Sequence, residues 1–365
     1  MTGVGFHGSY AAADVTFLLQ PLALQPIQDV LEKERLIQSG AKHYSEMLGR
    51  EQLPSADYLE LFHAAVSAFA ERMARDVLRL TRRIRAARPG AVTLVSLARA
   101  GTPVGVLLRR ALADVYGVDA PHYSVSIIRD RGLDAHALDH ILGSHSADSL
   151  VFVDGWTAKG TIASELHRSL QAYQASRGTS VPADLFVLCD LAGLAFASGS
   201  ADDYLIPSAL LNATVSGLVS RTILNHMIAA DQFHGCVFHA HWQTQDLSRW
   251  FITQIEQTRA RYQSAWLSEP LPSADRAALR QRSANLIATL MQRHDVKDPQ
   301  FIKPGIGEAT RALLRRAPGL LVLRDPGAVE VRHLVQLANE RRVVVQTDAT
   351  LSLHAVAIIR RLANE

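Results

Sequence analysis

The sequence predicts an α/β protein that has a parallel sheet, extensive helical additions and a small C-terminal α/β domain. Between residues 91 and 193, short β-branched apolar runs alternate with helical patterns. Long amphipathic stretches lie on either side of this region, and a compact unit rich in Val, Leu and Ile ends the chain. Strands that alternate with helices form βαβ units, and continuous apolar runs fit strands covered on both faces.

The composition is typical of a cytoplasmic globular protein. The chain has 365 residues, 48% of them hydrophobic, and a formal net charge of only +3. This length allows two or three domains, and so small a charge does not by itself point to nucleic acid. The N-terminus lacks a basic region and contains Asp14, so we expect no signal peptide, and no apolar run is long enough for a membrane helix. Cys189 and Cys236 cannot build a disulfide framework, which favours a reducing compartment.

Helices are predicted over most of residues 1–90 and over residues 200–300 apart from the polar stretch at 201–224. Residues 26–40 and 56–87 place apolar side chains three and four positions apart, and Pro89-Gly90 ends the second stretch.

Two polar groups in the second helical region need an interpretation. Asn212, Ser216, Ser220 and Arg221 recur at helical spacing, which slightly favours a polar stripe facing a cleft over close helix packing. The pair Asp202-Asp203 is interpreted as an exposed loop rather than a metal or base pocket.

Strands are predicted at the start of 91–112 and 149–170, each followed by a helix, and also in 122–130 and 185–193. In the C-terminal unit we expect a strand at 319–325, a helix at 329–340, a strand at 341–346 and a helix at 352–365. Residues 303–319 are rich in Gly and Pro, which indicates a joint before this unit.

The loop that follows Asp154 is the first candidate site. In VFVDGWTAKGT, a strand delivers a carboxylate, a loop of small residues follows, and a helix begins near Thr161. Loop amides and a helix N-terminus attract phosphate, while Thr157 and Lys159 offer a hydroxyl and a charge. The alternative is an ordinary strand–turn–helix connection in which Asp154 caps the helix.

The loop LARAGTPVG is the second candidate. Arg99 follows a strand and suits bidentate phosphate contact, and Gly101 would let the backbone approach a ligand closely. A surface arginine in an ordinary turn is the alternative. Both loops are expected at the carboxyl edge of the sheet, where ligands of parallel sheets bind.

Together the two strand–loop–helix units resemble type I phosphoribosyltransferases. The resemblance implies that Arg99, Ala100, Gly101 and Thr102 hold the pyrophosphate of phosphoribosyl pyrophosphate. It implies that the second loop holds the ribose and 5′-phosphate through Gly155, Trp156, Thr157, Ala158, Lys159, Gly160 and Thr161. Asp154 would orient the ribose and contact Mg²⁺, so Asp154 and Arg99 are the expected catalytic residues. The family usually has two adjacent acids, whereas here Gly155 follows Asp154.

A third loop, Ser126–Asp134, corresponds to the charged flap that closes over the reaction in this family. Arg129 and Arg131 would then hold pyrophosphate when the flap excludes water. A solvated charged turn is the alternative.

A closer resemblance spans nearly the whole chain. The motifs DVTFLL, QSGAKHYSEML, VDGWTAKGT, LIPSALLNATVSGLVSRT and KPGIGEATRALLRR are similar to those of phosphoribosyltransferase-like proteins of bacterial tellurite-resistance and stress gene clusters, also labelled the cysteine protease StiP family. This resemblance implies a phosphoribosyltransferase-like domain over 1–310. The tail resembles a Pelota-type RNA-binding domain, expected over 317–365.

The expected function is therefore pentosyl transfer by a glycosyltransferase that uses phosphoribosyl pyrophosphate and Mg²⁺. Its acceptor would be an unidentified base or nucleoside-like molecule, RNA would bind the C-terminal domain, and a homodimer is the candidate oligomeric state. One alternative is a non-catalytic stress protein that binds ribose phosphate and RNA. A less favoured one is a cysteine protease, in which Cys236 would use His234, His239 or His241 as base.

Overall fold

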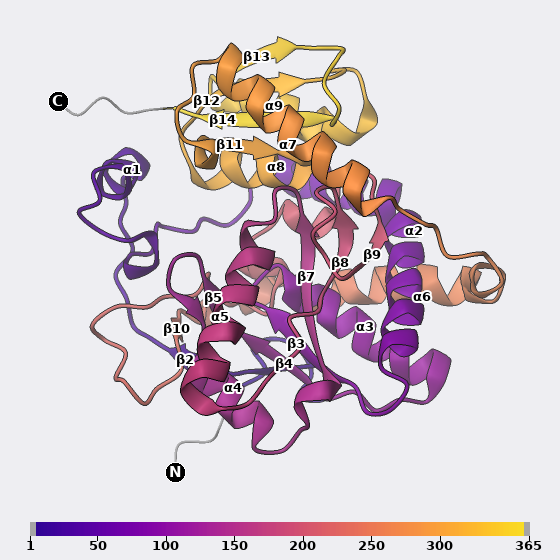
Figure 1. Cartoon of the computed structure of the whole chain (residues 1–365). Coiled ribbons are helices and arrows are strands. Elements are labelled where there is room, and N and C mark those ends of the chain that lie inside the picture. The colour runs from indigo at the N-terminus through magenta and orange to yellow at the C-terminus, as the bar shows by residue number, and fades with distance from the viewer. Residues whose placement is uncertain (1–4, 361–365) are drawn as a thin grey trace.

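A computed structural model describes residues 5–360, and its core is a six-stranded parallel sheet in the order β1-β4-β3-β7-β8-β9 (Figure 1). The strands are β1 (Thr16–Phe17), β3 (Thr93–Leu97), β4 (His122–Val125), β7 (Leu150–Thr157), β8 (Leu185–Asp190) and β9 (Ala197–Ser200). The predicted α/β class and the four predicted strands of the central region are confirmed.

Helices cover both faces of this sheet, which gives three layers. On one face lie α2 (Ala56–Ala87) and α3 (Gly101–Tyr116), and α6 (Ser248–Leu267) packs against both of them. On the other lie α4 (Ala135–Leu142) and α5 (Thr161–Arg177). Neighbouring strand residues point to opposite faces, so the continuous apolar runs fill two separate cores.

The N-terminal region is less helical than expected. Helix α2 forms as predicted, and Ser55 caps it by accepting the N–H of Tyr58. The helix predicted over 26–40 shortens to α1 (Val30–Gln38), which Asp29 caps. Residues 5–29 contain no helix and instead supply β1 and β2 (Gln20–Pro21).

The helical prediction for residues 200–300 is wrong for residues 225–247, and no α-helix forms between residues 201 and 247. This stretch forms short 3₁₀ turns, η3 (Pro207–Ala209), η4 (Ala213–Val215) and η5 (Ala240–Gln245), and the strand β10 (Gly235–Cys236) beside β2. A helix cannot continue past Gly217 and Leu218, whose φ angles are +78° and +60°. Helices resume with α6 and α7 (Arg276–Arg293).

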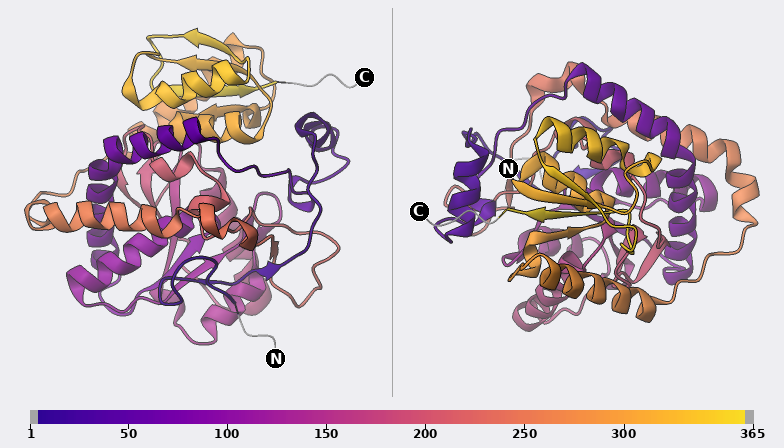
Figure 2. Two further views of the ribbon diagram at one scale, coloured as in Figure 1. Left: turned by 180° about the vertical axis from the view of Figure 1, so that it is seen from behind. Right: turned by 90° about the horizontal axis from the view of Figure 1, so that it is seen from above.

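The C-terminal unit is a second sheet in the order β11-β14-β12-β13, which lies above the large sheet (Figures 1 and 2). Its elements are β11 (Ile302–Pro304), α8 (Gly305–Arg315), β12 (Pro318–Leu323), α9 (Arg332–Glu340), β13 (Val344–Thr347) and β14 (Ala355–Ile359). The sheet takes its first strand from ahead of residue 317, and the expected joint at 303–319 is instead mostly β11 and α8.

The helix predicted over 352–365 is also wrong for its described part. Residues 355–359 form β14, which pairs antiparallel with both β11 and β12. All five side chains are buried, so the continuous apolar run belongs to a central strand. Residues 361–365 lie outside the described part of the chain.

The remaining short elements are connections. They are η1 (Tyr44–Glu46), β5 (Ile127–Ile128), β6 (Gly132–Leu133), η2 (Ala147–Ser149), η6 (Pro299–Phe301) and η7 (Val329–Val331). Between residues 5 and 360, no helix combines the length and the apolar character needed to cross a membrane.

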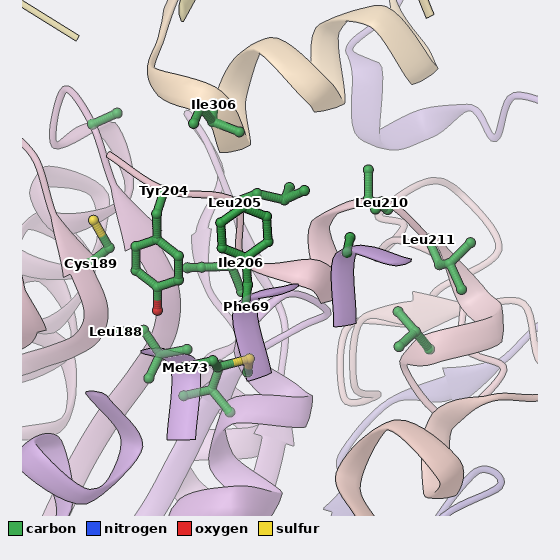
Figure 3. Close-up of a cluster of buried hydrophobic side chains, with 14 of the residues drawn as sticks. Phe69, Met73, Leu188, Cys189, Tyr204, Leu205, Ile206, Leu210, Leu211 and Ile306 are labelled. Atoms are coloured by element: carbon green, nitrogen blue, oxygen red, sulfur yellow. The ribbon is translucent and has the colours of Figure 1, made fainter. Parts of the chain in front are cut away.

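Asp203, in the segment after β9, joins the two sheets. Its carboxylate accepts the N–H of Ile306 at the start of α8 and the N–H of His354 just before β14, both at 2.8 Å. Ile306 packs into the apolar cluster around Tyr204 and Leu205 (Figure 3). The small domain is therefore held on the large one by a buried polar clamp and an apolar contact.

Candidate functional site

The loop after Asp154 lines a cavity of about 240 Å³, which we call the loop cavity. Helix α5 begins at Thr161, as the sequence predicts, whereas strand β7 continues to Thr157, three residues beyond its predicted end at Asp154. The loop and the first turn of α5 form one wall, residues 156–162. The remaining lining residues are Ile37, Tyr44, Arg129, Gln300, Lys303, Glu308, Arg311 and Arg316. Three segments far apart in the sequence thus meet the predicted phosphate loop.

The loop cavity is strongly basic. Its cationic side chains are Arg129, Lys159, Lys303, Arg311 and Arg316, and Glu308 is its one acidic lining residue. Arg316 binds both carboxylate oxygens of Glu34, and Arg129 pairs with Asp130.

The other three cations have no carboxylate partner among the described residues. The Lys159 ammonium donates to the carbonyls of Pro299 and Ile302, at 3.1 and 2.8 Å. For Lys303 and Arg311, in contrast, residues 5–360 provide neither a hydrogen bond nor a salt bridge to the side chain. These two cations are therefore available to an anion in the cavity.

The charges in the loop cavity influence one another. Burial, followed by repulsion from Lys159, lowers the pKa of Lys303 to about 7. Burial disfavours the Glu308 carboxylate, but Lys303 and Arg311 outweigh this effect and hold its pKa below the ordinary value. A bound anion would stabilise the charged form of Lys303.

Trp156 connects the loop to α8. The Arg311 guanidinium lies over the Trp156 ring, 4.4 Å from its centroid. A side chain at Gly307 would bring its Cβ to 2.5 Å from the same indole, so glycine is required there. The small domain therefore shapes the loop cavity.

Asp154 lies within β7, two residues before the first lining residue of this strand, Trp156, and is not itself a lining residue. Its carboxylate accepts the N–H of Gly155 at 2.8 Å. Burial raises its pKa to about 6, although Arg311 acts in the opposite direction. Such a carboxyl group is costly to ionise in the free protein, and a ligand that donates hydrogen bonds to it would relieve the cost.

Asp154 is also the expected contact for Mg²⁺. The described residues contain no group of three or more His, Cys, Asp or Glu side chains that could hold a metal ion. A single carboxylate fits a magnesium ion that takes its other ligands from substrate phosphates and water, as Mg²⁺ commonly does.

Arg99 faces away from the loop cavity. Its guanidinium pairs with Glu51 at 2.7 Å and donates to Asn212 Oδ1 at 2.9 Å and the Val219 carbonyl at 3.0 Å. It lines a second cavity of about 410 Å³, which we call the large cavity. Ala100 and Trp156 line the narrow space between the two cavities.

The glycine of this second loop has a packing role. A Cβ on Gly101 would lie 2.3 Å from the Val153 carbonyl, so glycine lets α3 approach β7. Thr102 is buried, with its hydroxyl 2.7 Å from that of Ser124. Packing against the adjoining strand therefore accounts for this glycine, and close approach of its backbone to a ligand stays a prediction.

The predicted flap is the β5–β6 hairpin. Arg129 lines the loop cavity, and its backbone N–H donates to the Tyr44 hydroxyl at 2.8 Å. Arg131 instead pairs with Glu46 at 2.8 Å. Only Arg129 of the two expected arginines reaches the cavity in this conformation.

The contribution of α8 to the loop cavity was not predicted from the sequence. In KPGIGEATRALLRR, Glu308, Arg311 and Arg315 follow at intervals of three and four residues, which marks one face of a helix. The glycines and prolines favoured a joint, and this spacing was the signal that could have identified the charged face.

Two other interpretations are partly right. Asp202 is exposed and pairs with Arg72, as expected of a loop, but Asp203 is buried in the domain contact. Asn212 and Arg221 do line the large cavity, although not from a helix.

Neither cysteine is suited to act as a nucleophile. Cys189 is buried among Leu188 and Tyr204 (Figure 3), and its thiol donates to the Asp202 carbonyl at 2.7 Å. Burial and then Asp203 raise its pKa well above the ordinary value. Burial raises the pKa of Cys236 to about 12. A nucleophilic cysteine needs a thiolate, which both environments disfavour.

The histidines near Cys236 have other contacts. The Nδ1 atom of His234 lies 2.8 Å from the Ser126 hydroxyl, and His239 stacks on Trp242 with ring centroids 4.3 Å apart. No hydrogen bond joins the Cys236 thiol to a histidine in the part of the chain that the structure describes.

Comparison with known proteins gives two family matches. Residues 8–256 match the family described as tellurite-like stress resistance cysteine protease StiP, and residues 281–361 match the PELOTA RNA binding domain. A relative from Acinetobacter baylyi, named cysteine protease StiP, is 41% identical over 373 aligned positions, which cover 98% of this chain and 95% of the relative.

Solved structures give only distant matches. The hypoxanthine phosphoribosyltransferase of Trypanosoma cruzi is 16% identical over 37% of this chain and 82% of that chain, with a TM-score of 0.26. A glutamine mutant at an invariant aspartic acid of such an enzyme is 17% identical over 36% of this chain and 77% of its own, with the same TM-score. A TM-score this low supports no conclusion about fold or function.

Proposed function

Because this chain belongs to the StiP family of tellurite-like stress resistance proteins, we propose that it is a stress-response enzyme whose loop cavity binds phosphoribosyl pyrophosphate. The observation that carries the proposal is the pair Lys303 and Arg311, two cations without carboxylate partners that line a cavity with the predicted phosphate loop. Phosphate groups are the ligands that such a loop, a helix N-terminus and free cations together favour.

The proposed reaction is transfer of the phosphoribosyl group to an acceptor. The acceptor nucleophile forms a bond to C1 of the ribose, the C1–O bond to pyrophosphate breaks, and the electron pair leaves on pyrophosphate. Positive charge develops on the sugar and negative charge on the leaving group. Lys303 and Arg311 stabilise the leaving group, and the N–H groups at the start of α5 hold the 5′-phosphate.

Asp154 orients the ribose by accepting hydrogen bonds from its hydroxyl groups. A magnesium ion bound with the substrate would neutralise pyrophosphate, with Asp154 as its contact on the protein. Arg99 is assigned to the large cavity, because Glu51 and Asn212 hold its guanidinium there.

The second candidate is a non-catalytic protein that binds ribose phosphate in the loop cavity and RNA through the region matching the PELOTA RNA binding domain. The observation that favours this candidate is that the loop has one acid, Asp154, where the resembled enzymes usually have two. A Cβ on Gly155 would be 3.7 Å from its nearest neighbour, the Ala100 carbonyl, so the second carboxylate is absent although space exists for it. Pyrophosphate release separates the two candidates.

The binding test uses phosphoribosyl pyrophosphate with magnesium, titrated into the protein by calorimetry. Lys303→Met is expected to weaken binding about tenfold or more, because it removes a charge-assisted contact to phosphate. Lys297→Met is the matched control, since Lys297 is exposed and lies outside the cavity. Equal affinity of the two variants would rule out the assigned site.

The turnover test measures pyrophosphate release with purine bases, pyrimidine bases, nucleosides or RNA as acceptors. Release that depends on one acceptor class and is lost in Lys303→Met supports the enzyme. Tight binding without release for any of them contradicts pentosyl transfer to these acceptors and favours the second candidate.

A further inference from the structure

The large cavity lies between the N-terminal segment, the turns after β9 and the small domain. Its volume of about 410 Å³ falls in the range of sites for small organic ligands, which starts at roughly 300 Å³. Residues 48–55 and 210–214 form two of its walls, and Arg315 and Arg341 contribute from the small domain. The loop cavity is separate, because the two share no lining residue.

Positive charge exceeds negative charge in this cavity. The cationic lining residues are Lys33, Arg50, Arg99, Arg221, Arg315 and Arg341, and the acidic ones are Glu51 and Glu340. Of these cations, Arg99 is the one that forms a salt bridge with a lining acid, Glu51. The others have no carboxylate within 4.0 Å in the described residues.

The remaining arginines bind neutral oxygens. Arg315 donates to Asn212 Oδ1 at 2.8 Å, Arg50 to the Gln28 side chain at 3.2 Å, and Arg341 to the Leu314 carbonyl at 3.3 Å. Arg221 donates to the carbonyls of Tyr44 and Met47. For the Lys33 ammonium, the structure gives no hydrogen bond within residues 5–360. These groups therefore hold several positive charges together without counter-ions.

This arrangement is electrostatically costly in the free protein. Burial, followed by repulsion from Arg221, lowers the pKa of Lys33 to about 8. Burial also lowers the pKa of Arg315 well below its ordinary value, with Arg99 and Arg311 adding to the effect. An anion in the cavity would offset both the burial and the repulsion.

The cavity also has an apolar and aromatic side. Val30, Leu53, Tyr58 and Leu337 are among its lining residues, together with Trp242. The Trp242 ring is held against His239, with an interplanar angle of 14°. A ligand that fills the cavity therefore needs both negative charge and a flat apolar part.

We infer that the large cavity is a second ligand site, which takes a nucleotide with its phosphates at the arginines and Lys33 and its base on the aromatic and apolar side. Arg99, Arg311, Arg315 and Trp156 line the space between this site and the loop cavity. The inference rests on the lining of the large cavity alone, so it does not require the proposed reaction.

The test is calorimetric titration with ADP, without added metal, of two variants and their matched controls. Lys33→Ala and Arg341→Ala remove cavity charges, whereas Lys42→Ala and Arg342→Ala remove exposed charges of the same kind that lie outside the cavity. Each cavity variant is expected to weaken ADP binding by about fivefold to tenfold, and both controls are expected to bind as the unmodified chain does. Lys303→Met should leave ADP affinity unchanged.

Four results would overturn the inference. The first is absence of ADP binding, and the second is equal loss in the cavity variants and their controls, which would indicate only general attraction of anions. The third is binding of pyrophosphate to the Lys303→Met variant as tightly as ADP binds to it, which would show that the base contributes nothing in the large cavity. Loss of ADP binding in Lys303→Met but not in Lys33→Ala would place the nucleotide in the loop cavity instead.

Discussion

Asp154 is the residue at which stability and the proposed ligand binding oppose each other. Its carboxyl group is buried within β7, with one N–H from Gly155 as its hydrogen-bond donor in the described structure. Its pKa of about 6 means that the folded chain holds a proton there more tightly than the unfolded chain. The stabilising contribution is complete below the ordinary value of 3.8 and is lost as the pH rises through about 6.

Asp154→Asn should therefore be more stable than the unmodified chain at pH 7, by about 2 to 3 kcal/mol, and of similar stability near pH 4. The same change should weaken binding of phosphoribosyl pyrophosphate, because the ribose hydroxyls lose a carboxylate acceptor. Chemical denaturation between pH 4 and pH 7 and a ligand titration at pH 7 measure the two effects. A variant that binds the ligand as well as the unmodified chain would remove Asp154 from the site.

At the residue scale, the sequence predicted features formed by adjacent residues but not contacts between distant segments. The loop from Trp156 to Thr161 could be identified because a strand, a small-residue loop and a helix are adjacent in the chain. The direction in which the Arg99 side chain points could not be predicted. Glu51 and Asn212, which hold its guanidinium, lie 48 and 113 residues away in the sequence. Lys303 and Arg311 come to the loop from another domain.

Helix α8 is the element on which both cavities depend. It supplies Glu308 and Arg311 to the loop cavity and Arg315 to the large cavity. Its register relative to the loop is fixed where Gly307 meets the Trp156 indole.

Gly307→Ala is expected to destabilise the protein by about 1 to 3 kcal/mol, because the added methyl group overlaps the Trp156 ring. Without this contact, alanine would stabilise a helix relative to glycine by about 1 kcal/mol. A decrease in the free energy of unfolding would therefore point to the contact with Trp156. Thermal unfolding measures the change, and affinity for phosphoribosyl pyrophosphate should fall as the ring shifts. Gly90→Ala is the control, since a Cβ there meets nothing within 4 Å. A stabilised Gly307→Ala variant would contradict the packing described.

The elements themselves were predictable where periodicity was unambiguous. Helix α2 and strands β3, β7 and β8 have clear patterns and sharp ends. Strand β14 was predicted as a helix because a short, wholly apolar run has no period that separates the two. Helix α8 was missed because its glycines meet other parts of the fold, Gly307 at Trp156 and Gly305 at Leu191, which only the folded structure reveals.

At the scale of the whole molecule, the small domain is part of the site rather than an appendage. Asp203 fixes its position by accepting N–H groups from two separate elements of that domain. The acid is buried, so a substitution leaves these N–H groups without a partner and without water.

Asp203→Asn should cost about 2 to 4 kcal/mol, since an amide retains one acceptor oxygen and directs a donor at the other N–H. Hydrogen exchange should increase most in α8 and β14. Asp202→Asn is the adjacent control, because its exposed ion pair with Arg72 is worth at most about 1 kcal/mol. Equal effects of the two substitutions would show that Asp203 does not anchor the domain.

The sequence indicated that a second domain exists but not where it lies. Composition and strand–helix alternation predicted a compact C-terminal unit. Its position on the large domain depends on Asp203, which the sequence placed in an exposed loop. The number of strands in the small sheet could not be predicted either. Strand β11 has only three residues, and it is recognised as a strand through its pairing with β14.

The cationic linings of the two cavities have a consequence for how quickly ligands arrive. The chain as a whole carries a formal charge of only +3, so its long-range field is weak. Cationic side chains nevertheless outnumber acidic ones in the linings of the large cavity and the loop cavity. Field lines focused in such openings guide anions over the last stretch of diffusion. Association rates should therefore fall as ionic strength rises, although the overall charge is close to neutral, while dissociation rates should change less.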